Sequence, residues 1–185
     1  MKDPLIKGHP LHAMLSDLPI GITAVSVAFD ALSVITGARR WRSAARATLG
    51  MAFLSGCAAA LVGLWDYQAV PREHPAHRTG AVHGWLNASA LALLLLSLSG
   101  RLGRKGNERK YKVDAAQKLS LAALIVLGLS GWFGGELVFR LGWRVTPAEH
   151  AEQLEADLLK SGDGVRIEKA HRIVQEYEQT HALLP

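Results

Sequence analysis

The sequence predicts an all-α fold: an integral membrane four-helix bundle built as two repeated helical hairpins, followed by a short amphipathic helical C-terminal tail. The stretch His83–Ser99, HGWLNASALALLLLSLS, contains no acidic residue, lysine or arginine. Three further stretches of similar character lie before and after it. A chain of 185 residues is too short to surround four such helices with soluble layers, so they require a bilayer.

The predicted spans and the tail divide the chain into two parts. A bundle is expected over residues 1–144, and an extracytoplasmic helical tail over residues 145–185. At a rise of 1.5 Å per residue, each apolar segment is about 25–35 Å long, which matches the hydrocarbon core of a bilayer. The predicted spans cover about residues 15–36, 44–65, 83–99 and 119–141.

Charge in the connections predicts the orientation of the spans. Gly37 ends the first span and a basic stretch without acids follows it, while a second basic stretch follows the third span. Because positively charged loops stay in the cytoplasm, both loops are expected inside and both termini outside. The sequence therefore predicts a multi-pass protein of the bacterial plasma (inner) membrane with its N- and C-termini on the extracytoplasmic side. The net charge of +5 reflects this orientation and not nucleic-acid binding.

The polar tail contains two helical patterns. Thr146-Pro147-Ala148-Glu149 predicts a capping box with proline at the first helical position, so a helix is expected from there to Lys160. A second helix is expected from Val165 to His181, after a turn that contains glycine. Both helices are short and amphipathic. They therefore need a docking surface on the membrane, on their own bundle or on a partner protein.

Short motifs recur in the two halves of the bundle and predict an internal repeat. His12-Ala13-Met14-Leu15-Ser16 opens the first span, and His83-Gly84-Trp85-Leu86-Asn87 opens the third. The second and fourth spans end in glycine, tryptophan and an acid, as Gly63-Leu64-Trp65-Asp66 and as Gly131 to Glu136. Parallel repeats of this kind imply a pseudo-two-fold axis along the membrane normal. Chance similarity of short motifs is the alternative.

Histidines and carboxylates gather on the predicted outer side. A carboxylate inside the end of a span needs a partner, and His12 and His83 open two spans at a similar depth. These residue types suit a transition-metal ion or the edge of a haem. The candidate haem ligands are His12 and His83, and the candidate metal ligands are His9, His12, Asp66, His83 and Glu136. The eight histidines on this side are His9, His12, His74, His77, His83, His150, His171 and His181.

Three interpretations of this cluster stay open. The first is a metal ion or a single haem b near the outer surface, because no helix offers the histidine pair about 13–14 residues apart that two stacked haems need. The second is a quinone-binding or proton-handling site. The third is structural: the polar groups cap and pair helix ends without a cofactor. No nucleophile–base pair with a recognisable spacing indicates an enzyme, and the single cysteine, Cys57, excludes an internal disulfide.

Two further features concern the interior of the bilayer. Small residues one turn apart, as in Gly56-x-x-x-Ala60 and Gly131-x-x-x-Gly135, predict close helix contacts. Asp30, near the inner end of the first span, is expected to pair with a basic residue of the inner loops.

The series of motifs resembles a bacterial family of four-helix membrane proteins, domain-of-unknown-function family 2231, over about residues 9–142. Some members of that family are joined to Rieske iron–sulfur proteins or neighbour them, which implies a redox context. This chain has a helical tail in place of a Rieske cysteine–histidine pattern, a departure that favours docking to a partner. The matching residues are His9-Pro10-Leu11-His12, Leu18-Pro19-Ile20-Gly21, Gly63-Leu64-Trp65-Asp66, His83 with Asn87, and Gly134-Gly135-Glu136-Leu137-Val138.

Together these observations predict a redox-associated membrane subunit with an outer-facing histidine and carboxylate site for haem b or a transition-metal ion. The alternative is a cofactor-free structural or assembly subunit whose tail docks a partner. The expected partners are the lipid bilayer and a membrane or extracytoplasmic protein, such as a redox complex. Homo-oligomerisation is a further option, and no nucleic acid is expected.

Overall fold

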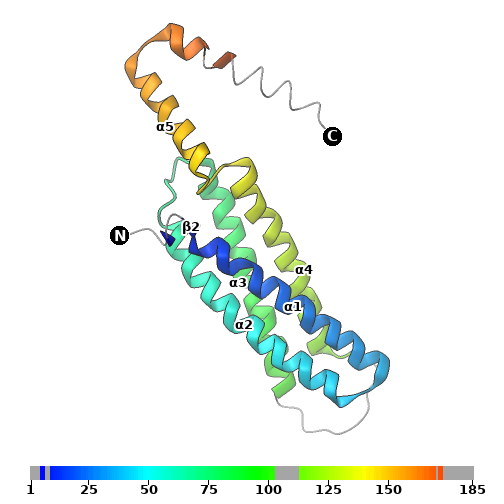
Figure 1. Cartoon of the computed structure of the whole chain (residues 1–185). Helices are drawn as coiled ribbons and strands as arrows, with labels where there is room; N and C mark the ends of the chain where they lie inside the picture. The colour runs from blue at the N-terminus through cyan, green and yellow to red at the C-terminus, as the bar shows by residue number, and fades with distance from the viewer. Residues whose placement is uncertain (1–4, 7–8, 103–112, 170, 173–185) are drawn as a thin grey trace. The chain divides into compact units, whose positions relative to one another are not determined.

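The computed structural model describes the chain except for residues 1–4, 7–8, 103–112, 170 and 173–185, and the described residues form two compact units divided after Leu141 (Figure 1). A two-residue antiparallel pairing of β1 with β2 precedes the first helix of unit one. The elements of unit one are β1 (Leu5–Ile6), β2 (His9–Pro10), α1 (Leu11–Thr36), α2 (Arg39–Tyr67), α3 (Pro75–Leu102), α4 (Ala115–Gly135) and the π-helical η1 (Glu136–Arg140). Unit two contains α5 (Thr146–Ser161).

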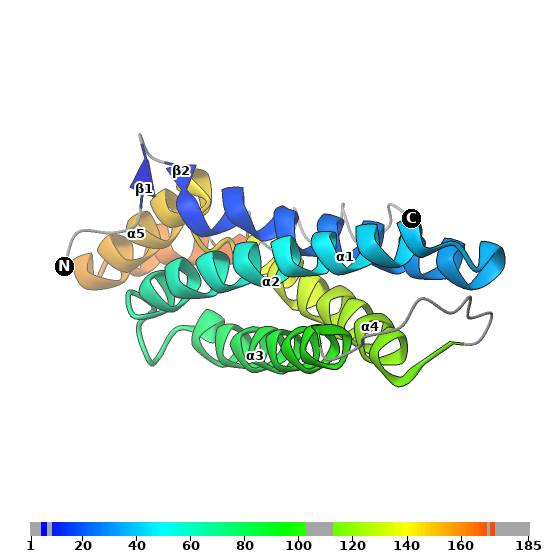
Figure 2. The ribbon, with the colours of Figure 1, turned by 90° about the horizontal axis from the view of Figure 1, so that it is seen from below.

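The four long helices of unit one form an antiparallel bundle of two hairpins. Helix α1 packs mainly on α2, and α3 packs mainly on α4. Further contacts join α2 to α3 and α1 to α4, so the helices close into a ring (Figures 1 and 2). We call the end where α1 and α3 begin the histidine end, and the end where α2 and α4 begin the arginine end.

The distribution of side chains in the bundle is that of a membrane protein. The residues that α1 buries include Thr23, Ser26, Asp30 and Ser33, which recur every three or four positions and so share one face. Large apolar side chains such as Leu54 and Ile125 are mostly exposed. Each of the four helices is long and apolar enough to cross a membrane, by length and composition. Because water would penalise this arrangement and lipid favours it, the bundle belongs in a bilayer.

The helices extend beyond most of the predicted spans. Helix α1 begins at Leu11 and ends at Thr36, and Gly37, which was expected to end the first span, forms a left-handed C-cap with a φ of 63°. Helix α3 begins at Pro75, eight residues before the predicted span, because proline is compatible with a first helical position. The last turn of the fourth helix is π-helical, and Leu141 N donates to Glu136 O at 3.0 Å.

The tail agrees in part with its prediction. Helix α5 covers the expected range, but it begins at Thr146 itself, and its N-cap Val145 has no side-chain cap hydrogen bond. The side chains of Thr146 and Glu149, which would form the predicted capping box, lie outside what the structure describes. Residues 164–169 and 171–172 are helical, and the rest of the expected second tail helix lies outside the described residues.

Close contact at a small residue is confirmed at Gly56. A Cβ atom built on Gly56 would lie 2.8 Å from Leu91 Cδ2, so the glycine of α2 leaves room for this side chain of α3.

Candidate functional site

The histidine end brings His12 of α1 and His83 of α3 into direct contact. Their ring centroids are 5.9 Å apart and their planes are inclined by 80°, an edge-to-face arrangement. Both side chains are half-buried. The sequence predicted that these two histidines open their spans at a similar depth, and the structure places them side by side.

Backbone hydrogen bonds determine the tautomer of both rings. Nδ1 of His12 lies 3.0 Å from the carbonyl oxygen of Ala59, and Nδ1 of His83 lies 2.8 Å from that of Ser130. A carbonyl oxygen only accepts, so each Nδ1 must be protonated and donate. In the neutral ring Nε2 is then unprotonated, which is the form in which histidine binds a metal.

Two glycines make room for the rings. A Cβ on Gly63 would lie 2.7 Å from Cε1 and from Nδ1 of His12, which is closer than a Cβ atom can approach another heavy atom without a shift of one of them. A Cβ on Gly134 would lie 3.2 Å from Cε1 of His83. Each imidazole therefore lies against the bare backbone of the other helix in its own hairpin.

The two histidines differ in their remaining contacts. Asn87, one turn after His83 on α3, donates from Nδ2 to Nε2 of His83 at 3.0 Å. The Ser130 hydroxyl lies 3.0 Å from Nδ1 of His83 and donates to the carbonyl oxygen of the same histidine at 3.2 Å. His83 is thus held at both ring nitrogens. A ligand that bound its Nε2 would have to displace the amide of Asn87.

The other predicted ligands lie in different surroundings. His9 is exposed on β2, and Asp66 is buried near the end of α2, where it takes part in a polar interaction. Glu136 forms an ion pair with Arg140, one turn further along η1. Within the part of the chain that the structure describes, no three His, Cys, Asp or Glu side chains converge to hold a metal ion. The assignment of His9, Asp66 and Glu136 as metal ligands stays a prediction.

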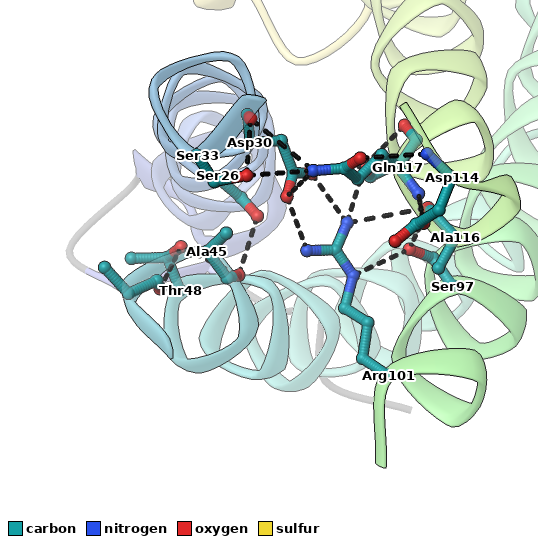
Figure 3. A network of polar contacts seen from close by, with 12 residues as sticks. Ser26, Asp30, Ser33, Ala45, Thr48, Ser97, Arg101, Asp114, Ala116 and Gln117 are labelled. Carbon is teal, nitrogen blue, oxygen red and sulfur yellow. Dashed lines mark hydrogen bonds and ion pairs between the residues drawn. The ribbon is translucent and has the colours of Figure 1, made fainter. Parts of the chain in front are cut away.

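A second polar cluster lies at the arginine end, where the guanidinium of Arg101 meets the carboxylate of Asp30 (Figure 3). Two parallel bonds join them, Nη1 to Oδ1 at 2.7 Å and Nη2 to Oδ2 at 2.6 Å. Only 10% of the Arg101 side chain and 8% of the Asp30 side chain are exposed. The prediction that Asp30 pairs with a basic residue is confirmed, although that residue lies in the last turn of α3 and not in a loop.

Polar side chains of α4 complete this cluster (Figure 3). The Ser120 hydroxyl donates to Oδ2 of Asp30 at 2.9 Å, and Gln117 Nε2 lies 3.0 Å from Ser33 Oγ and 3.4 Å from Oδ1 of Asp30. Nε of Arg101 donates to Ser97 Oγ at 3.3 Å. A buried ion pair is tolerated when its remaining donors and acceptors are satisfied in this way. The cluster joins α1, α3 and α4.

Sequence reasoning missed the hydroxyl and amide groups that hold both clusters. Ser26, Ser33, Ser97, Ser120 and Ser130 are at most 1% exposed. No role was predicted for these isolated serines within the apolar spans. Their spacing was the signal in the sequence: Ser26 and Ser33 lie four and three positions from Asp30, so they share its helix face.

The bundle and its two polar ends define a four-helix membrane protein. The chain belongs to the family described as predicted membrane protein (DUF2231), whose family model matches residues 8–147, so the resemblance noted from the motifs is confirmed. No curated protein and no solved structure matches the chain.

Proposed function

We propose that this protein is a redox-associated membrane subunit in which His12 and His83 bind haem b or a transition-metal ion at the histidine end of the bundle. The observation that supports this most directly is the pair of hydrogen bonds from Nδ1 to Ala59 O and Ser130 O. They fix two neighbouring imidazoles in the tautomer that offers Nε2 to a metal.

The donor types suit such a group, and the separation of the rings is within the upper limit for a shared ion. A metal 2.0–2.1 Å from two imidazole nitrogens places their ring centroids at most about 6.4 Å apart, and the observed separation is 5.9 Å. Two neutral imidazoles suit haem iron and first-row ions such as zinc and copper. When bound, a haem or redox-active ion would supply one-electron chemistry, while the bundle holds the rings and excludes lipid.

The site is proposed to face the extracytoplasmic side of a bacterial plasma membrane. Arg39, Arg40, Arg42 and Arg46 all lie in the first turns of α2, at the arginine end, and the described part of α2 has no acid in its first turn. The positive-inside bias assigns that end to the cytoplasm. The opposite, histidine end would then lie on the extracytoplasmic side, and the tail is proposed as a docking element for a partner.

A specific observation favours a second candidate, a cofactor-free structural subunit. Asn87 already occupies Nε2 of His83, and Glu136 is paired with Arg140. In this alternative the polar groups of the histidine end serve only to hold the helices in register.

A visible absorption spectrum with elemental analysis of the detergent-purified full chain distinguishes the two. We expect a Soret band that shifts on dithionite reduction, or one equivalent of a transition metal without such a band. Whichever signal is found should disappear in His83→Ala and in His12→Ala. It should persist in His171→Ala, which changes an exposed tail histidine. A colourless, metal-free protein that also takes up neither added haemin nor added copper or zinc would overturn the redox proposal and leave the structural one.

A further inference from the structure

The same contacts recur within each of the two hairpins, with residue numbers that differ by a constant 71. His12 bonds to the carbonyl 47 residues later, at Ala59, and His83 bonds to the carbonyl 47 residues later, at Ser130. Position 12 plus 71 is 83, and position 59 plus 71 is 130. The same shift relates Gly63 to Gly134, and each of these glycines contacts the histidine of its own hairpin.

The shift holds at the arginine end as well. Ser26 Oγ donates to Ala45 O at 2.8 Å, and Ser97 Oγ donates to Ala116 O at 2.6 Å; both bonds span 19 residues (Figure 3). Adding 71 converts the first pair into the second. Matching bonds at both ends of each hairpin indicate that the hairpins have the same internal geometry. The matching glycine of the fourth helix is then Gly134, and not the Gly131 suggested by the motifs.

The ion pair occupies equivalent positions of the two hairpins, because 30 plus 71 is 101. Asp30 follows His12 by 18 residues, and Arg101 follows His83 by 18 residues, about 27 Å along each helix. Each of these two contacts therefore joins a residue of the first hairpin to the equivalent residue of the second hairpin. They are the contact of His12 with His83 and the ion pair of Asp30 with Arg101. Contacts between equivalent positions are what a two-fold axis produces.

We infer that the bundle consists of two equivalent hairpins related by a pseudo-two-fold axis that passes through both contacts, and that the Asp30–Arg101 pair selects which hairpins associate. The interaction surface of each hairpin fits the other hairpin of this chain or the corresponding hairpin of a second copy. The opposite charges favour the association of a first hairpin with a second hairpin.

The Asp30–Arg101 pair can select between hairpins because both of its charged groups are buried. Two first hairpins in the same geometry would bring two carboxylates together, and two second hairpins would bring two guanidinium groups together. Like charges in a buried site are strongly unfavourable, whereas the observed pair is satisfied by two direct bonds. The pair thus acts against the pairing of like hairpins and stabilises the native one.

The first test exchanges the charges in the full chain. Asp30→Arg and Arg101→Asp should each lower the thermal unfolding midpoint in detergent by roughly 10 °C or more, because each creates a buried pair of like charges. The double variant D30R/R101D should recover at least half of that loss. A double variant no more stable than the single variants would overturn the proposal.

The second test asks whether the positions are equivalent or merely close. Ser120, which donates to the Asp30 carboxylate, corresponds to Leu49, a fully buried core residue of α2. In D30R/R101D the carboxylate has moved to the second hairpin, so its matching hydroxyl should come from position 49. Adding L49S/S120L should therefore raise the midpoint of D30R/R101D.

The same exchange, L49S/S120L, in the native charge background is the matched control. There it should lower the midpoint, because it removes the hydroxyl from Asp30 and buries another one in an apolar core. If L49S/S120L lowers the midpoint in both backgrounds, the hairpins are not equivalent and the inference fails.

The third test uses two full chains. A D30R chain places two buried arginines at positions 30 and 101, and an R101D chain places two buried aspartates there, so each chain is destabilised alone. If the two chains exchange hairpins in a heterodimer, every arginine faces an aspartate. Co-expression with two different affinity tags should give a complex that contains both tags and has a higher midpoint than either chain alone. Chains that co-purify no more than two tagged native chains would contradict the assigned selectivity. None of these readouts depends on a cofactor, so they can fail independently of the proposed function.

Discussion

The imidazole of His12 lies edge to face against that of His83, 5.9 Å between centroids, although the two residues are 71 positions apart in the chain. Each ring is fixed by a carbonyl of the other helix in its own hairpin, at Ala59 or at Ser130. Neither ring depends on a flexible loop for its position. The pair is therefore organised by helix packing before any ligand binds, which is the arrangement a binding site needs.

Replacing Gly63 by alanine should disrupt one half of this pair. The new Cβ would lie 2.7 Å from the His12 ring, so the ring must move away from Ala59 O and lose its hydrogen bond. We expect a loss of roughly 1–3 kcal/mol in the free energy of unfolding, measured by denaturant titration in detergent. Gly50→Ala, on the same helix with no atom within 4 Å, is the control and should be neutral or stabilising by up to about 1 kcal/mol. Equal effects of the two changes would contradict the assigned contact.

Replacing Asn87 by alanine should strengthen ligand binding if the site works as proposed. The Asn87 amide occupies Nε2 of His83, and removing it frees that lone pair at the cost of one neutral hydrogen bond. Such a bond is worth about 0.5–1.5 kcal/mol, so the dissociation constant for the metal or haem identified in the purified protein should fall about two- to tenfold. Titration of apo protein, followed by absorbance or calorimetry, measures this. Ser89→Ala, which changes an exposed serine of α3, should leave affinity unchanged. Weaker binding by the Asn87 variant would show that Asn87 supports the ligand and does not compete with it.

Most of the fold could be predicted because lipid imposes simple constraints. Four long apolar segments in a short chain have few solutions in a bilayer, and hydropathy, glycine and charge identified them. The start of α5 at Thr146 was predictable from the residue types, whereas the side-chain contacts of the expected capping box lie outside the described residues. The π-helical turn at Glu136 has no signature in the residue types.

The candidate site was only partly predictable, for a geometric reason. Depth in the membrane follows from counting residues, so His12 and His83 were correctly expected at a similar level. Which face of a helix points inward depends on packing between helices, and no single span reveals it. The ion pair of Glu136 with Arg140, one turn away on the same helix, was therefore not predicted. Asn87 and the buried serines became visible only once those faces were known.

The orientation of the bundle can be tested by cysteine labelling, since Cys57 is the single native cysteine. On a Cys57→Ala background, Glu73→Cys introduces a thiol near the histidine end and Ser43→Cys one near the arginine end, both at exposed positions. With a membrane-impermeant maleimide, intact spheroplasts should label the first variant and not the second. Lysed spheroplasts should label both. The opposite pattern would contradict the assignment of the histidine end to the outside.

The buried ion pair predicts a strongly non-additive mutant cycle. Asp30→Leu leaves the guanidinium of Arg101 buried without a carboxylate, and Arg101→Leu leaves the carboxylate without its cation, so each should cost about 3–5 kcal/mol in unfolding free energy. The double variant D30L/R101L removes both charges. Its cost should be far below the sum, because Gln117 still donates to Ser33, and the Ser120 hydroxyl, freed from Asp30, can donate its proton to the carbonyl oxygen of Gln117, 2.9 Å away.

The exposed tail pair of Asp163 with Arg166 provides the control cycle for this measurement. Those side chains are 42% and 76% exposed, and a pair in that setting should couple by less than about 1 kcal/mol. A coupling energy for Asp30 and Arg101 no larger than that of the tail pair would show that water screens the buried pair. If the coupling is large while D30L/R101L stays folded, the charges are dispensable for stability. The role of the two charges is then to disfavour the pairing of like hairpins. In that case D30L/R101L chains should exchange hairpins more readily than native chains.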